Sequence, residues 1–172
     1  NKSIALNIEA KTVREKLRGD DPLSYAWTLN NLANSYLGIE NYEQAEHIHL
    51  ENKAFKERTI GKQHPDYAKG LSNLANVYRR MGKYEAAESL YLEAQAIEIK
   101  ILGNKHPDYA EILYGLAYLY WEMGISSKAY LSFLELSTLN QYLISKASNH
   151  LSERELSTYL DKFTAIQNQT LS

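Results

Sequence analysis

The chain has 172 residues, which is one domain's worth, and its 44% hydrophobic and 23% charged residues are typical of a folded globular protein. Nineteen Lys and Arg against twenty-one Asp and Glu give a net charge of −2, so the chain lacks the overall positive field that nucleic-acid binding needs. The absence of cysteine excludes disulfides, thiolate zinc sites and a cysteine nucleophile within these residues.

No segment predicts a membrane span or a secretory signal. The longest apolar stretch, apart from one Gly, runs from Tyr114 to Trp121, far short of the roughly 20 residues that cross a bilayer. Residues 1–10 lack a basic region followed by an apolar one. We therefore expect a cytoplasmic protein that does not interact with membranes.

An internal repeat dominates the chain. His64-Pro65-Asp66-Tyr67-Ala68 recurs 42 residues later as His106-Pro107-Asp108-Tyr109-Ala110. Segment 24–65 aligned on 66–107 without a gap gives 18 identities in 42 positions. The period extends backward through Gly61 and Gly19, so residues 1–19 are predicted to be the truncated second helix of a preceding repeat.

Each complete unit predicts two antiparallel helices. Apolar residues recur at i, i+3, i+7 and i+10, as at Ala68, Leu71, Ala75 and Tyr78, which is a helical period. Glycines such as Gly82 end the first helix, with Glu40 at the equivalent place in the first unit, and X-Pro pairs begin the next unit. The predicted units span 24–62, 66–104 and 108–148, the last with an extended second helix.

The repeated Leu74-Ala75-x-x-Tyr78, Gly82-x-Tyr84 and Ala87 pattern resembles the tetratricopeptide repeat (TPR). The 42-residue period, longer than the common 34, resembles the subclass found in kinesin light chains and in many bacterial proteins. The resemblance implies an all-α fold, a right-handed superhelical solenoid of antiparallel helix pairs. The residues at Asn52, Leu136, His49 and Ser126 depart from the pattern, so their units are expected to pack less tightly.

Beyond the third unit the repeat decays. Ser152 and Glu155 form a capping box, and apolar residues at helical spacing follow, which predicts a C-terminal capping helix over 152–170. The segment from Leu139 to Leu160 also resembles the region that joins bacterial TPR arrays to the CHAT domain, a caspase-like peptidase.

The sequence contains no motif that indicates a catalytic site or a metal site. His47 and His49 are two residues apart on a helix and point in different directions, while the repeat's turn explains His64 and His106. Glu46 and Glu88 are expected on the solvated outer face of the second helices. No catalytic residue, metal site or cofactor is predicted, and the chain is expected not to be an enzyme.

The resemblance implies that the first helices line a concave surface for a protein or peptide. Asn34 and Asn76, equivalent in adjacent units, are expected to pair with a ligand's backbone unless they bond a neighbouring repeat, and Lys69, Arg79 and Arg80 to attract acidic groups. The third unit's aromatic residues face the ligand unless the C-terminal helix covers them. The predicted concave residues are Trp27, Asn30, Asn31, Asn34, Lys69, Ser72, Asn73, Asn76, Arg79, Arg80, Tyr114, Tyr118 and Trp121.

Two functions follow from these resemblances. The first is a non-enzymatic scaffold that binds a protein segment in the groove. The second is a regulatory TPR region of a longer CHAT-type cysteine peptidase, whose catalytic domain would act as an intramolecular partner beyond residue 172. TPR arrays serve many unrelated partners, so the fold alone does not choose between them.

Overall fold

The computed structural model describes residues 2–16 and 21–148, and within these ranges it consists of helices joined by short turns, with no strand. This confirms the predicted all-α architecture. The seven helices of the described residues are α1 (Lys2–Lys16), α2 (Pro22–Leu37), α3 (Tyr42–Thr59), α4 (Pro65–Arg80), α5 (Tyr84–Ile101), α6 (Pro107–Glu122) and α7 (Ser126–Ser148).

The first helices of the three hairpins begin as the X-Pro pairs predict. Before α2, Asp21 Oδ1 accepts a hydrogen bond from the Ser24 amide at 3.0 Å. Before α4 and α6, the Nδ1 atoms of His64 and His106 accept from the amides two residues on, at 3.1 and 3.3 Å. The two histidines therefore act as N-caps.

The turns within the hairpins share one backbone conformation. Gly82 and Gly124 lie in the left-handed region, with φ of 72° and 73°. The equivalent residue of the first hairpin is Glu40, which adopts φ of 60° although it carries a side chain. The register predicted from the repeat therefore holds even where the glycine is missing.

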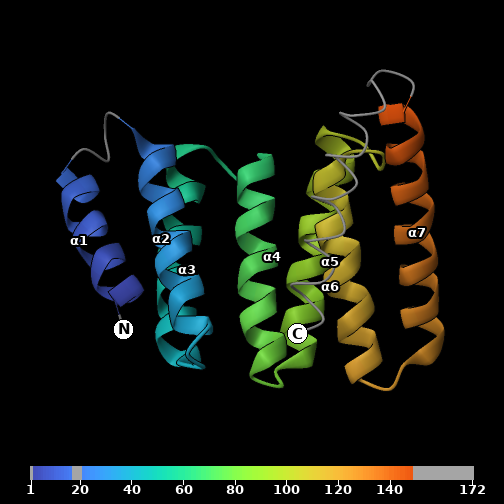
Figure 1. Ribbon diagram of the computed structural model, residues 1–172, viewed down its shortest axis with the longest axis horizontal. Helices are drawn as coiled ribbons and strands as arrows, with labels where there is room; N and C mark the ends of the chain where they lie inside the picture. The colour runs from blue at the N-terminus through green and yellow to red at the C-terminus, as the bar shows by residue number, and fades with distance from the viewer. Residues whose placement is uncertain (1, 17–20, 149–172) are drawn as a thin grey trace.

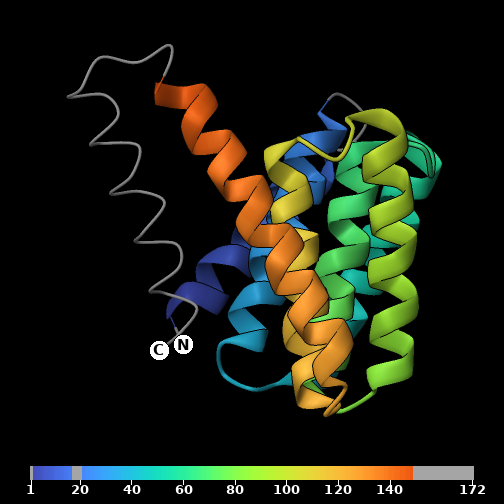
Figure 2. The ribbon, with the colours of Figure 1, turned by 90° about the vertical axis from the view of Figure 1, so that its right-hand side faces the viewer.

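The helices stack side by side in chain order (Figure 1). α2 packs on α3, α4 on α5 and α6 on α7 as antiparallel hairpins, and α1 packs on α2. Figure 2 shows α7 at the end of the stack, with α6 directly behind it. We keep the predicted units 24–62, 66–104 and 108–148 as a proposal, and use their 42-residue register to compare positions.

The core follows the repeat. The central cluster joins α4, α5, α6 and α7 through residues that include Leu71, Ala87, Tyr91 and Leu116, all at most 3% exposed. Separate clusters lie within the first hairpin and between α6 and α7. Because each hairpin buries the face of its neighbour, stability is shared along the stack.

Two carboxylates on the outer face of the second helices bond to the following hairpin, which the sequence does not predict. Glu88 on α5 accepts a hydrogen bond from the Tyr120 hydroxyl at 2.8 Å and pairs with Lys128 at 2.9 Å. Glu46 on α3 pairs with Lys83 at 3.1 Å. The expectation that these two carboxylates are merely solvated is wrong, because each ties its helix to the following hairpin.

Several large apolar side chains of α7 are exposed, among them Tyr130 at 66%, Leu131 at 61% and Leu134 at 50%. The predicted capping helix over 152–170 lies outside the described residues. Among the described helices, none has the length and apolar character needed to span a membrane.

Candidate protein-binding surface

The first helices α2, α4 and α6 carry all thirteen predicted concave residues. Trp27, Asn34, Lys69, Arg80 and Trp121 are exposed. The half-buried ones are Asn30, Asn31, Asn73, Asn76, Arg79, Tyr114 and Tyr118. Ser72 is buried, so the exposed part of this surface has twelve of the predicted members.

Ser72 corrects the prediction. Its side chain is 6% exposed, and its hydroxyl donates to the Ala68 carbonyl one turn earlier at 3.3 Å. The residue faces the contact between α4 and the neighbouring hairpin, where Glu98 and Ile112 line the same small cavity. A ligand on the surface would not reach it.

The predicted asparagine residues are partly engaged with one another and with neighbouring helices. The Asn73 amide donates to the Asn30 side-chain oxygen, which joins α4 to α2. The Asn76 oxygen accepts from the Tyr91 hydroxyl at 2.8 Å. Asn34 remains exposed. The two equivalent amides therefore differ, because Asn76 offers a ligand its N–H groups while Asn34 can offer both an acceptor and donors.

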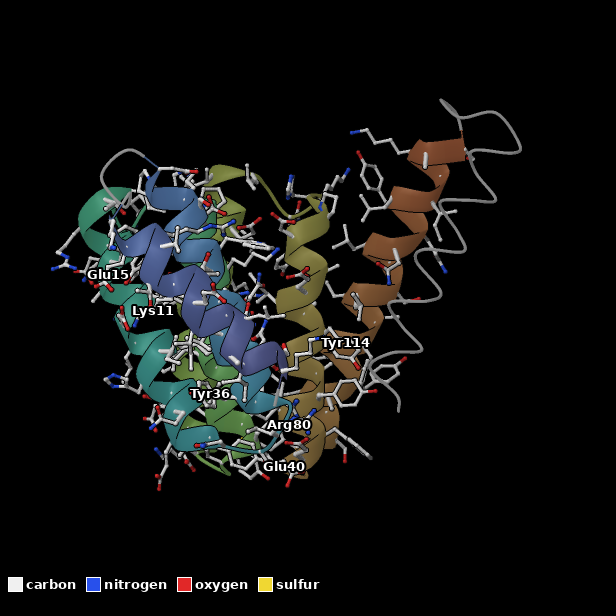
Figure 3. All side chains as sticks on the ribbon, turned by 60° about the vertical axis from the view of Figure 1, so that its left-hand side comes forward. Lys11, Glu15, Tyr36, Glu40, Arg80 and Tyr114 are labelled. Carbon is white, nitrogen blue, oxygen red and sulfur yellow. The ribbon has the colours of Figure 1, made fainter. Side chains whose placement is uncertain are left out.

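Two of the three predicted cations are already paired. Lys69 lies 3.8 Å from Glu111, and Arg79 forms an ion pair with Glu122, in each case with a carboxylate on α6. Each of these two cations therefore already lies beside a carboxylate of the neighbouring first helix, which reduces its attraction for an acidic ligand. Arg80 is exposed and shares a shallow hollow with Glu40 (Figure 3).

The aromatic residues of α6 form one cluster. The ring centres of Tyr114 and Tyr118 lie 4.5 Å apart, and Tyr118 meets Trp121 edge-on at 5.9 Å. Phe133 of α7 supports Tyr118 from behind at 5.6 Å. A hydrogen bond with the Tyr114 side chain, followed by burial, raises the pKa of Tyr118. Although it contacts Tyr118, Trp121 keeps 65% of its surface exposed.

Trp27 occupies the same kind of position on α2. Its side chain is 61% exposed, and the Arg14 guanidinium of α1 lies 5.4 Å from the ring centre. Arg14 is itself held by the Thr28 hydroxyl at 2.5 Å. The surface therefore presents a supported indole on its first helix and another on its last.

Sequence reasoning missed the residues that support this surface. Phe133, Arg14 and Tyr91 lie on α7, α1 and α5, outside the first helices, and each holds a predicted surface residue in place. The signal that could have found Tyr91 is its place in the repeat, where its ring enters the core beneath the next hairpin. The same register also points to the other two, because Phe133 is equivalent to Tyr91 and Arg14 is equivalent to Lys56.

Comparisons with known proteins agree with this architecture. The family model described as tetratricopeptide repeat matches residues 26–97 and 66–129, more than half of the chain. The crystal structure of BtubC (BKLC) from P. vanneervenii superposes with a TM-score of 0.73 and 21% identity, over 82% of this chain and 56% of that one. The chain thus spans little more than half of BtubC. No curated protein matches the chain.

Two further structures come from a Podosopora anserina protein that is predicted to be a kinesin light chain and has nearly identical TPR-like repeats. Both have a TM-score of 0.62 and 20% identity, and they cover 99% and 98% of this chain and 87% of theirs. At these identities the likeness shows the fold alone. The comparisons lend no support to the CHAT resemblance, whose residues after Ser148 lie outside the described part of the chain.

Proposed function

The chain belongs to the tetratricopeptide repeat family, and on that premise we propose that it is a non-enzymatic scaffold that binds an extended segment of a partner protein along α2, α4 and α6. TPR domains bind protein partners and are typically without catalytic activity. The ligand would lie across the first helices, from Trp27 toward Trp121.

The observation that carries the proposal is the exposure of the two tryptophans. Trp27 and Trp121 keep 61% and 65% of their surface exposed while other aromatic or cationic side chains support them from the side. Tryptophan is enriched at the energetic centres of protein interfaces, because a rigid indole buries a large area at a low cost in conformational entropy. Two supported indoles on one helix layer favour a binding surface over ordinary packing.

The charges on this surface favour a ligand with apolar or aromatic anchors over an acidic one. Glu111 and Glu122 lie beside Lys69 and Arg79, so a ligand carboxylate would meet repulsion from these two carboxylates as well as attraction from the cations. Asn34 and the N–H groups of Asn76 can bond the backbone of an extended segment. We therefore assign the binding affinity for the ligand to the aromatic cluster. The amides of Asn34 and Asn76 would set the position of the ligand's backbone along the helices.

A peptide library displayed on phage and selected on the intact 172-residue chain tests the proposal. Selected peptides are then measured by isothermal titration calorimetry against the native chain and against Trp121→Ala. We expect Trp121→Ala to weaken binding by more than about tenfold, equivalent to about 1.4 kcal/mol, as loss of an interface anchor does.

The matched control is Tyr130→Ala, since Tyr130 is an equally exposed aromatic residue, at 66%, on α7 rather than on a first helix. It should leave the affinity unchanged. Peptides that bind Trp121→Ala as tightly as the native chain but fail on Tyr130→Ala would place the binding surface on the second helices and contradict the proposal.

A further inference from the structure

A buried carboxylate lies at the junction between α5 and α6. Glu98, in the last turn of α5, is 2% exposed, and among the described residues its Oε1 atom has no hydrogen-bond partner. Burial, followed by the nearby charge of Asp108, raises the pKa of Glu98. An unpartnered buried carboxyl oxygen is costly, so a group that binds it would stabilise the junction.

Two more ligand-type atoms converge on this oxygen. His106 Nδ1 lies 3.5 Å from Glu98 Oε1 and 3.8 Å from Asp108 Oδ2, and the ligand atoms of the three residues all lie within 4.8 Å of one another. Tetrahedral zinc with bonds of about 2.0 to 2.1 Å holds its ligand atoms about 3.3 Å apart. The side chains of His106 and Asp108 are 36% and 49% exposed, so solvent and ions can reach the space between them.

A small cavity adjoins two of the three residues, Glu98 and Asp108. Its volume of about 10 Å³ is close to the space that one water molecule needs. Its walls include the carboxylates of Glu98, Asp108 and Glu111 and the ammonium-bearing Lys69 of α4. The Lys69 ammonium pairs with Glu111 at 3.8 Å. The space next to Glu98 is thus of the size of an ion or a single water.

The preceding junction supplies an internal comparison. It has the same turn, His64-Pro65-Asp66, and its residue equivalent to Glu98 is Lys56. Lys56 is 7% exposed, and its Nζ atom donates to the Asp66 carbonyl at 2.8 Å. One junction therefore has a lysine at this place, bonded to the backbone of the next helix, whereas the next junction has a carboxylate with one oxygen that lacks a hydrogen-bond partner among the described residues.

We propose that Glu98, His106 and Asp108 bind a divalent transition-metal ion, with Zn²⁺ as the best match, and that the ion joins α5 to α6. One imidazole and two carboxylates suit zinc better than magnesium or calcium, which prefer oxygen ligands alone. The two carboxylates balance the ion's charge, and three protein ligands leave a position for water.

The geometry also limits the affinity. His106 Nδ1 now accepts a long hydrogen bond of 3.3 Å from the Asp108 amide, and coordination would replace that bond. The positive end of α6 opposes a nearby cation. We therefore expect weaker binding than at zinc sites built from cysteines, and a site that responds to changes in the ion's concentration.

Titration of the intact chain with ZnCl₂ in a non-chelating buffer, followed by calorimetry, tests the proposal. We expect one equivalent of zinc and a rise in melting temperature on binding. Glu98→Gln keeps the side chain's shape and His106→Asn keeps a capping acceptor, and each should weaken binding by at least about tenfold. Circular dichroism verifies that both variants are folded.

Two controls separate the site from adventitious surface binding. Glu93→Gln removes an exposed carboxylate from the same helix, and His64→Asn removes the equivalent imidazole of the preceding junction. Both should bind zinc as the native chain does. The proposal is overturned if the native chain takes up no zinc, or if Glu98→Gln and His106→Asn bind as tightly as the two controls.

Discussion

The junction between α3 and α4 and the junction between α5 and α6 have the same backbone but different side-chain partners. Both use a His-Pro-Asp turn, with the histidine capping the following helix at 3.1 or 3.3 Å. Lys56 crosses Gly70 at the first, where a Cβ atom would lie 3.6 Å from Lys56 Cδ. At the second, Glu98 and Ile112 occupy the equivalent positions and line one cavity.

A second pair of positions differs in the same way. Tyr91 is fully buried at the α5–α6 junction, and a Cβ atom on Gly115 would come within 2.4 Å of its ring. The equivalent residues of the preceding junction are His49, buried to 1% exposure, and Asn73. The large Tyr91 ring thus occurs together with Gly115, whereas the smaller His49 ring occurs together with the larger Asn73. The repeat preserves the backbone while residue sizes compensate across each interface.

The largest predicted effect tests this compensation directly. Gly115→Ala would place a methyl group against Tyr91, whose ring cannot easily move because its hydroxyl is bonded to Asn76 at 2.8 Å. We expect a loss of about 3 kcal/mol in the free energy of unfolding, at the upper end for an overpacked core. Urea denaturation measures it.

The matched substitution is Gly70→Ala at the other junction. Its methyl group would make an ordinary contact with Lys56, and alanine favours a helix interior over glycine by up to about 1 kcal/mol. Gly70→Ala should therefore be neutral or stabilising. Equal losses in the two variants would show that the junctions do not differ in the way described.

The sequence predicts the helices and their register well, because these depend on local signals. The 42-residue period, the X-Pro starts and the left-handed turn positions, including Glu40, all hold in the structure. The capping bonds of His64 and His106 are harder to predict, because imidazole is not among the side chains that commonly cap a helix N-terminus.

The partners of charged and polar residues were not predictable in the same way. Arg79 and Lys69 pair with carboxylates that follow by about one repeat, and Glu98 meets a histidine of the next helix. These contacts depend on how far one hairpin is displaced from the next. A repeat pattern gives which residues are equivalent, but not which of them face each other.

The second prediction concerns His49, whose place in the next unit is taken by Tyr91. Burial, followed by the charge of Lys56, lowers the pKa of His49 to about 4. Because the unfolded chain then binds more protons than the folded one below pH 6.5, acid destabilises the fold. Between pH 7 and pH 5 the free energy of unfolding should fall by about 2 kcal/mol through this residue.

His49→Leu should remove that part of the pH dependence. Neither ring nitrogen of His49 has a hydrogen-bond partner among the described residues, so an apolar side chain of similar volume leaves no polar group unpaired. The control is His47→Leu at an exposed position of the same helix. If both variants keep the native chain's loss of stability from pH 7 to pH 5, His49 is not the group responsible.

The smallest predicted effect compares the tyrosines that follow the two turns. The Tyr109 hydroxyl donates to Glu135 at 2.8 Å and accepts from Gln95 at 2.8 Å, whereas the buried Tyr67 hydroxyl has no hydrogen-bond partner in residues 2–16 and 21–148. Removing a bonded hydroxyl leaves its partners unsatisfied, so Tyr109→Phe should cost about 1 kcal/mol. Tyr67→Phe removes only an unpaired polar group and should be neutral or slightly stabilising. Parallel urea titrations at pH 7 measure the free energy of unfolding of both variants. If Tyr67→Phe loses more stability than Tyr109→Phe, the Tyr67 hydroxyl contributes at least as much as the bonded Tyr109 hydroxyl, and the comparison is wrong.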